Sequence, residues 1–298
     1  MLDDLSRRVL AYADSRNVGD EPSATDVPRL NVSRQRMPTE LAPVLYEPIF
    51  CLVLQGAKQA LQGRRVVDFR EGHSVIVGID LPTEARVVEA SHEQPYIALA
   101  LKLDMGLVRE LSTEPGADGD FGPDGAAISA AEADEAIIDA MGRLFALVEK
   151  PAALPVLHPL LMREIHYWLL CASHGSLLRA LARAGSHASR IAEAIAIIRG
   201  NFERPLVVAD LAASVGMSVS AFHFHFKAIT GTTPLQYQKR LRLIEASRLI
   251  RSGRQSVSSA AFSVGYQSPT QFSREYARTF GLPPLRHTRV PAPVSAPD

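Results

Sequence analysis

Apolar residues recur at helical spacing in two stretches of the last third of the chain, and the two stretches resemble each other. In each stretch, three large apolar residues stand at i, i+4 and i+7 or i+8, which predicts an amphipathic helix that buries one stripe. The opposite face of each helix is therefore expected to be exposed. The stripe consists of Phe222, Phe226 and Ile229 in the first stretch and of Phe272, Tyr276 and Phe280 in the second.

The residues around these helices repeat as well. Gly216 aligns with Gly265 at an offset of 49 residues, and Gly231 aligns with Gly281 at an offset of 50. In each copy a short Ala-rich helix leads through the first glycine into the amphipathic helix, which the second glycine and a following proline end. This order predicts a helix-turn-helix that occurs twice within residues 206–285.

The exposed faces of the two amphipathic helices carry mostly residue types that hydrogen-bond to base edges or hold phosphates. The segment 234–252 between the copies predicts a helix of about eighteen residues, or roughly 27 Å. Such a spacer suits two helices that enter successive major grooves about 34 Å apart, so double-stranded DNA is the predicted partner. The candidate DNA-binding residues are Ser220, His223, Phe224 and Lys227 in the first copy and Thr270, Gln271, Arg274 and Arg278 in the second.

The distribution of charge agrees with this interpretation. The chain has 32 Lys and Arg against 32 Asp and Glu, but 14 of the basic and 6 of the acidic residues lie from His187 onward. The C-terminal part therefore carries a net charge of +8 and the remainder −8. A basic module attached to an acidic one is expected when only one of the two meets a polyanion.

The C-terminal stretch resembles the double helix-turn-helix DNA-binding domain of AraC/XylS-type bacterial transcription regulators. The resemblance covers the whole of residues 206–285 and implies a sequence-specific transcription regulator that acts together with RNA polymerase. The residues that carry it are Phe226, Lys227, Thr230, Gly231, Pro234, Tyr237, Arg242, Ala246, Leu249, Ile250, Gly265, Ser268, Phe272, Ser273, Arg274, Phe280, Gly281 and Pro284.

One candidate departs from the pattern of that family. Phe224 stands where the relatives commonly have Arg, and a Phe ring cannot form a hydrogen bond to a base edge. The ring either contacts a thymine methyl group or packs against the linker helix, and the sequence leaves both interpretations open. Base recognition is better supported for the second copy, where Arg274 is intact.

Short apolar runs with intervening glycines occupy residues 46–102 and predict an antiparallel β-barrel or sandwich. The run 49–54 does not alternate with polar residues, so we expect a strand that is buried on both faces. This part resembles the cupin-like N-terminal domain of one branch of the same regulators, through the pattern LYEP..CLVLQG.K from Leu45 to Lys58. The resemblance implies a barrel that senses a small molecule or a stress signal.

Helices are predicted on both sides of the barrel. A first helix lies along residues 2–12 and ends within 16–19, and the segment 113–127, rich in Gly, Pro and Asp, is expected to be a mobile surface loop. Ser129 and Glu132 form a capping box that opens a helix to about residue 149. Another helix begins near Pro159, a shorter one spans 177–184, and Ser186 caps the helix that follows.

A few side chains are candidates for ligand binding, redox chemistry or metal binding. Cys51, in the predicted apolar strand, is either a core thiol or a reactive or ligand-lining thiol, which makes it the effector or redox candidate. His223 and His225 point about 200° apart on a helix, which disfavours a shared metal. His73 and His92 lack the His-x-His spacing of metal-binding cupins. No catalytic residue, cofactor or metal ligand is predicted, and no phosphate loop or nucleophile elbow occurs.

The composition suits a soluble protein of two domains, with 298 residues, 47% hydrophobic residues and 21% charged residues. The first residues contain no apolar core of a secretory signal, and no apolar run approaches the ~20 residues of a membrane span. Cys51 and Cys171 are too few for a disulfide framework or a four-ligand zinc site. We therefore expect a cytoplasmic protein without a membrane anchor.

The predicted fold class is α+β, with an N-terminal cupin-like antiparallel β-barrel, a helical connector and a C-terminal all-α double helix-turn-helix. The expected domains are 1–112 for the first helix and the sensor barrel, 113–185 for the connector and 186–290 for DNA binding, followed by a disordered tail at 291–298. The expected partners are DNA, RNA polymerase, a small-molecule effector and a second copy of the chain. The alternatives are a cupin-type enzyme with a non-functional DNA-binding tail and an architectural DNA-binding protein without effector.

Overall fold

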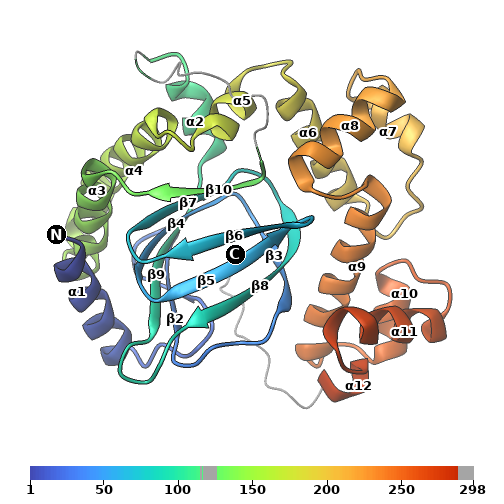
Figure 1. The fold of residues 1–298 in the computed structure, drawn as a ribbon, viewed down its shortest axis with the longest axis horizontal. Coiled ribbons are helices and arrows are strands. Elements are labelled where there is room, and N and C mark those ends of the chain that lie inside the picture. Colours follow the sequence, from blue (N-terminus) through green and yellow to red (C-terminus); the bar gives the residue numbers. More distant parts are fainter. Residues whose placement is uncertain (115, 117–125, 288–298) are drawn as a thin grey trace.

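Figure 1 shows the computed structural model, which describes residues 1–114, 116 and 126–287. The expected disordered tail at 291–298 and most of the expected loop at 113–127 lie outside these residues. A β-domain occupies one side of the molecule, and the last six helices of the described chain lie on the other side. The predicted order of an N-terminal β-domain and a C-terminal helical domain is confirmed.

In the described part of the chain, the strands form two antiparallel sheets, as predicted. The larger sheet has the order β1-β2-β9-β4-β7-β10, and the smaller has the order β3-β8-β5-β6. The strands are β1 (Ser23–Ala24), β2 (Leu30–Gln35), β3 (Ala42–Tyr46), β4 (Ile49–Gln55), β5 (Ala57–Gln62), β6 (Arg65–Arg70), β7 (His73–Val77), β8 (Leu81–Glu89), β9 (Tyr96–Lys102) and β10 (Ile128–Glu132).

Strand β4 lies between β9 and β7 in the larger sheet, and both of its faces are covered. Phe50 and Leu52 point outward beneath the helices, whereas Val53 points into the barrel, and all three side chains are fully buried. The prediction of a strand buried on both faces is thus confirmed for most of its length. Cys51 is not fully buried: its side chain faces the interior of the barrel and is half-buried.

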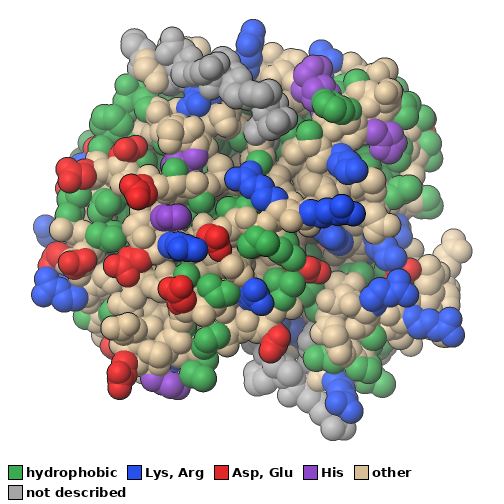
Figure 2. Space-filling model, viewed as in Figure 1, with side chains coloured by type: hydrophobic (Ala, Val, Ile, Leu, Met, Phe, Trp, Pro, Cys, Tyr) green, Lys and Arg blue, Asp and Glu red, His purple; other side chains and the backbone are tan. Residues whose placement is uncertain are grey.

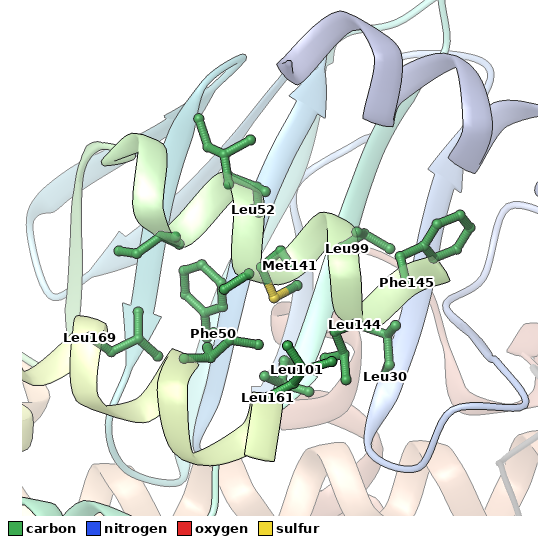
Figure 3. Packing of buried hydrophobic residues seen from close by; sticks show 14 of the residues in the cluster. Leu30, Phe50, Leu52, Leu99, Leu101, Met141, Leu144, Phe145, Leu161 and Leu169 are labelled. Carbon is green, nitrogen blue, oxygen red and sulfur yellow. The ribbon is translucent and has the colours of Figure 1, made fainter. Parts of the chain in front are cut away.

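Three helices, α1 (Leu2–Ser15), α3 (Glu135–Phe145) and α4 (Leu154–Cys171), cover the outer face of the larger sheet. Figure 3 shows this layer, where Phe50, Leu99 and Leu101 of the sheet pack against Met141 and Leu144 of α3. Burying these side chains stabilises the fold by about 1.5–3 kcal/mol each. The apolar stripe predicted for α3 therefore has the expected partner.

The connector differs from its prediction in two places. Ser129 and Glu132 lie in strand β10, which pairs with β7, so they form no capping box, and α3 begins only at Glu135. The ladder to β7 satisfies the backbone groups of this segment, and the barrel sheet therefore extends past residue 112. Helix α4 begins at Leu154, after the 3-10 turns Ala146–Glu149 and Pro151–Ala153, and contains Pro159 in its interior.

Helices α5 to α11 follow the predictions closely, whereas α2 and α12 were not predicted. Ser186 caps α6 as expected, and its hydroxyl accepts a hydrogen bond from Ser189 N–H at 2.9 Å. No single helix of the described residues has the length and apolar composition to cross a membrane, although the bent pair Glu135–Glu149 and Pro151–Cys171 meets these criteria jointly. The helices are α2 (Met105–Leu111), α5 (Ser176–Ala182), α6 (His187–Gly200), α7 (Val208–Ser214), α8 (Val219–Thr230), α9 (Pro234–Arg251), α10 (Val257–Ser263), α11 (Pro269–Phe280) and α12 (Pro284–His287).

The two helix-turn-helix units are joined differently to the rest of the molecule. The core of the first unit, which includes Phe222 and Phe226, forms one hydrophobic cluster with the barrel interior, which includes Val53 and Ala60. The second unit has a separate cluster around Phe272. The barrel and the first unit therefore share a core, whereas the second unit packs on the C-terminal part of α9 in a core of its own.

Candidate nucleic-acid interface and sensor barrel

The first helix-turn-helix consists of α7 and α8, and α8 is its recognition helix. The Ser218 hydroxyl caps α8 by accepting a hydrogen bond from Ala221 N–H at 3.3 Å, and Gly216 makes the turn with a φ of 65°. A positive φ of this size favours glycine, which explains the residue type at this position. Phe222 and Phe226 are fully buried, so the stripe predicted from their spacing faces the core.

All four candidates on α8 are exposed. Ser220, His223 and Lys227 project away from the buried stripe, as their positions predicted. Phe224 is 69% exposed, which argues against the interpretation that its ring packs against the linker helix α9. A large apolar side chain in water contributes nothing to folding, so the exposed ring is available for a contact with a partner.

His225 is held by a neighbour that the sequence did not indicate. Its ring stacks on that of His187 at the start of α6, with the ring centroids 3.8 Å apart and 18° between the planes. The ring of Phe224 meets His225 edge-on at 5.1 Å. Burial and the neighbouring His187 lower the pKa of His225. His187 therefore supports the side of α8 from which Phe224 projects.

The second unit consists of α10 and α11, and its recognition helix α11 exposes Thr270, Gln271, Arg274 and Arg278. Ser268 caps this helix by accepting a hydrogen bond from Gln271 N–H at 3.3 Å. The helix ends at a glycine in the left-handed conformation, as α8 does. The predicted arrangement of the second copy is confirmed.

Glu275 connects α11 to Tyr266 and to α9, and it was not among the residues predicted from the sequence. It accepts hydrogen bonds from Tyr266 Oη at 2.7 Å and from Gln271 Nε2 at 3.4 Å, and it pairs with Lys239 Nζ of α9 at 2.9 Å. Burial alone would raise the pKa of Glu275, but these three partners outweigh it and lower the pKa. The i, i+4 spacing to Gln271 is the signal that could have identified it.

Helix α9 is the predicted spacer, and Arg242 makes it rigid with respect to both units. The guanidinium donates to Phe202 O at 2.6 Å and Arg204 O at 2.9 Å before the first unit, and to Gly265 O at 3.2 Å in the turn of the second. Gly265 fits only without a side chain, because a Cβ there would lie 2.0 Å from Glu203 O. The relative position of the two recognition helices is therefore constrained.

The C-terminal end of α8 docks on the barrel. Ile229 O accepts hydrogen bonds from Gln62 Nε2 at 2.5 Å and from Ala127 N–H at 3.0 Å. The backbones of Gly63 and Gly231 lie so close that a Cβ on Gly231 would be 2.6 Å from Gly63 N. Gln62 and Ile229 are 167 residues apart, so no local pattern in the sequence could have indicated this contact.

A second contact joins α6 and α9 to the barrel. The Arg199 guanidinium pairs with Glu47 Oε1 and with Asp80 Oδ1, each at 2.5 Å. The Tyr237 hydroxyl of α9 donates a hydrogen bond to Asp80 O at 2.6 Å. The hydrogen bonds from Arg199 lower the pKa of Glu47 despite its partial burial. Together these groups connect the β3–β4 and β7–β8 turns to the DNA-binding half.

The redox or effector candidate Cys51 faces the interior of the barrel. Its neighbours in the sheet are Val75 and Ala100. Burial raises the pKa of the Cys51 thiol to about 11, although Lys58 lowers it in part. Because the thiolate is the reactive form, this pKa disfavours a redox role and favours a thiol that lines the interior. Within the described residues there is no group of three or more His, Cys, Asp and Glu that could hold a metal.

Figure 2 shows how the charges predicted from the sequence lie on the surface. In this view Asp and Glu side chains gather mostly over the β-domain and its covering helices, while Lys and Arg side chains predominate over the helical half. This separation matches the net charges of −8 and +8 counted before and after His187. A net positive charge on the helical half favours the approach of a polyanion to that half.

Comparison with protein-family models gives two matches. The model described as the AraC-type transcriptional regulator N-terminus matches residues 26–177, which is about half of the chain. A helix-turn-helix domain model matches residues 211–289. The two matches correspond to the barrel with its covering helices and to the double helix-turn-helix.

Curated relatives match over a shorter length. An AraC-like transcription regulator of Streptomyces lividans is 36% identical over 101 residues, which is 34% of this chain and 33% of that protein. The transcriptional activator RhaS of Escherichia fergusonii is 33% identical over 96 residues, which is 32% of this chain and 34% of that protein. The chain thus matches about a third of the length of these relatives.

Solved structures resemble this protein in fold over most of the chain. The structure of ToxT from Vibrio cholerae with a bound unsaturated fatty acid has a TM-score of 0.60 and 11% sequence identity. The match covers 87% of this chain and 94% of ToxT. At this identity the comparison concerns the fold alone, and the combination of a β-domain with a double helix-turn-helix is common to both.

Proposed function

The chain belongs to the AraC-type transcriptional regulators, and from this premise we propose that it binds specific DNA sites through α8 and α11 under the control of a small molecule held in the barrel. The observation that carries the proposal is the exposure of all eight candidate residues on two recognition helices whose other faces are buried. Two such helices joined by one rigid spacer suit two successive major-groove segments.

The proposal assigns different tasks to the exposed residues. Arg274 offers a guanidinium that can pair with guanine O6 and N7, and Gln271 is oriented beside it by Glu275. Lys227 and Arg278 supply phosphate contacts, and Ser220, His223 and Thr270 are hydrogen-bonding residues for phosphates or base edges. Phe224 supplies an apolar contact to a thymine methyl group. The second unit accordingly contributes more hydrogen-bonded base recognition than the first.

Two contacts would couple the barrel to DNA binding. The Gln62–Ile229 hydrogen bond holds the end of α8, and the Arg199 ion pairs hold α6 at the β3–β4 turn. A ligand that shifts the barrel would therefore change the position or mobility of the first recognition helix relative to the second. Such a ligand acts by its different affinity for the two arrangements.

The proposed partners include a second copy of the chain and RNA polymerase. Helix α4 presents a row of exposed apolar side chains, Val156, Leu157, Leu160 and Trp168, beside a shallow depression that includes Tyr167. A second copy packed on this helix would bury them. RNA polymerase is the partner through which a regulator bound to DNA acts in the cytoplasm. The proposal includes no catalytic step and no cofactor.

Arg274→Ala in the full-length chain tests the DNA-binding proposal. Sites are first selected from random duplexes, and the affinities of the wild type and of the variant are then measured for all single-base changes. We expect a loss of about 1–3 kcal/mol, confined to sites with guanine at one position, and an affinity of the wild type that falls steeply with salt.

Arg109→Ala is the matched control, because Arg109 is equally exposed but lies on α2, far from the recognition helices. It should leave both affinity and preference unchanged. The proposal fails if the wild type binds no duplex in a salt-dependent manner, or if Arg274→Ala behaves like the control.

A further inference from the structure

A few inward-facing side chains of the barrel keep accessible surface. Leu30, Leu52 and Leu99, which point outward beneath the helices, are fully buried. Ser33 and Cys51, which point inward from β2 and β4, each keep accessible surface. Accessible surface on inward-facing side chains requires space that protein atoms do not fill. Small barrels commonly hold a ligand in such a space.

Lys58 of β5 points into the same interior. It pairs with Phe69 of β6 and Val87 of β8, and both of these belong to the cluster inside the barrel. Directly opposed residues of antiparallel strands project from the same face of the sheet. The ammonium group lies 5.3 Å from the centroid of the Tyr46 ring, which places it among inward-facing side chains.

This ammonium group has no counterion within the described residues. The ion pairs that lysines form there involve Lys102, with Glu47, and Lys239, with Glu275. Burial lowers the pKa of Lys58, whereas attraction and a hydrogen bond from Tyr46 and attraction from Cys51 raise it, and the net shift is upward. No carboxylate is paired with this ammonium group in the described part of the chain, which leaves its charge available to an anionic ligand.

The hydroxyl of Tyr46 lacks an acceptor. The oxygen is buried and no acceptor for its proton occurs in the described part of the chain, while the neighbouring Lys58 ammonium can only donate. A hydroxyl left in this state costs about 1–3 kcal/mol. An ammonium group without a counterion and a hydroxyl without an acceptor therefore lie next to each other on the inner face of the barrel.

We propose that the barrel interior binds a small organic carboxylate, whose anionic group is held by the Lys58 ammonium and the Tyr46 hydroxyl and whose apolar part lies against Val44 and Ile49. Val44 and Ile49 line the interior and are half-buried, so they offer apolar surface. One positive charge and one hydroxyl match a single carboxylate. The inference rests on the proposed function, because it names the class of ligand that the sensor barrel takes.

The test uses purified full-length protein and a panel of monocarboxylates, namely acetate, octanoate and benzoate, each compared with its uncharged methyl ester by titration calorimetry. We expect at least one carboxylate to bind at least tenfold more tightly than its ester. Lys58→Met should abolish this preference, and Tyr46→Phe should reduce it. Lys150→Met is the control, because Lys150 lies between the two 3-10 turns, outside the barrel, and it should retain the preference.

A measurement of stability separates binding from a structural role. Lys58→Met should keep a cooperative thermal transition, so that a lost preference for the carboxylate reflects lost binding and not unfolding. The inference is overturned if the wild type prefers none of the carboxylates to its ester, or if Lys58→Met keeps the preference. DNA binding is measured on the same samples, so a protein that binds DNA without any preference for carboxylates loses this inference and keeps the proposed DNA-binding function.

Discussion

Phe224 shows most clearly how the surroundings of a single residue indicate its role. Its ring is 69% exposed on a helix whose apolar stripe lies on the opposite side. The edge-on contact with His225, which in turn stacks on His187, limits the directions that the ring can take. An apolar ring that is held in solvent on a recognition helix is suited to a contact with a thymine methyl group.

Phe224→Ala should therefore weaken binding chiefly at sites with thymine at one position, and replacing that thymine by uracil should have the same effect on the wild type. The melting temperature should stay unchanged, because little of the ring is buried. Affinities for single-base variants of a selected site, together with thermal melts, check both points. A variant of normal stability with unchanged site preference would contradict the thymine contact.

The two recognition helices end in the same way, but their C-terminal ends have different surroundings. Helices α8 and α11 both end at a left-handed glycine, Gly231 with a φ of 74° and Gly281 with a φ of 71°. A Cβ on Gly281 would meet nothing within 4 Å, whereas a Cβ on Gly231 would collide with the backbone of Gly63. The same helix end is thus a free cap in one unit and a docking point on the barrel in the other.

Gly231→Ala and Gly281→Ala form a matched pair that measures this difference. Each places a side chain in the left-handed region and should lower the free energy of unfolding by about 1–2 kcal/mol. Gly231→Ala should in addition separate α8 from the barrel, which hydrogen exchange detects as faster exchange of the Ala127 amide. Equal exchange in the two variants would mean that the docking does not depend on this close approach.

At the scale of the whole molecule, an acidic β-domain and a basic helical half share a hydrophobic core, and polar contacts at its edge add to it. Arg199 joins the halves through Glu47 and Asp80, and Tyr237 adds a hydrogen bond to Asp80. Arg199 and Glu47 are each 40% exposed, so solvent screens their attraction.

Arg199→Ala should lower the free energy of unfolding by about 1–2 kcal/mol at pH 7. This value is at the low end of the range for hydrogen bonds between charged groups, because solvent screens the pair. The folded state lowers the pKa of Glu47 below its usual 4.5, so the pair contributes fully above that pH and its contribution is lost as the pH falls below it. Unfolding titrations at pH 7 and pH 4 should give a smaller difference between wild type and variant at the lower pH. A difference that grows on acidification would contradict this role of Glu47.

The sequence by itself determined the features that depend on near neighbours in the chain. A helix cap such as Ser186, the glycine turns and the buried stripe of each recognition helix depend on residues within a few positions, so their spacing predicts them. The strands and the acidic and basic halves could be predicted for the same reason. The candidates on α8 and α11 are exposed because the opposite faces of these helices are apolar.

Only the tertiary structure decided which of these elements meet. The spacing of Ser129 and Glu132 is typical of a helix start. The segment is nevertheless a strand, because hydrogen bonds to β7, which is distant in the sequence, satisfy its backbone groups. The contact between Gln62 and Ile229 and the position of Lys58 inside the barrel, opposite Val87, likewise depend on residues distant in the chain. Local periodicity carries no information on such distances, so the docking of the first recognition helix and the chemistry of the barrel interior became visible only in the folded chain.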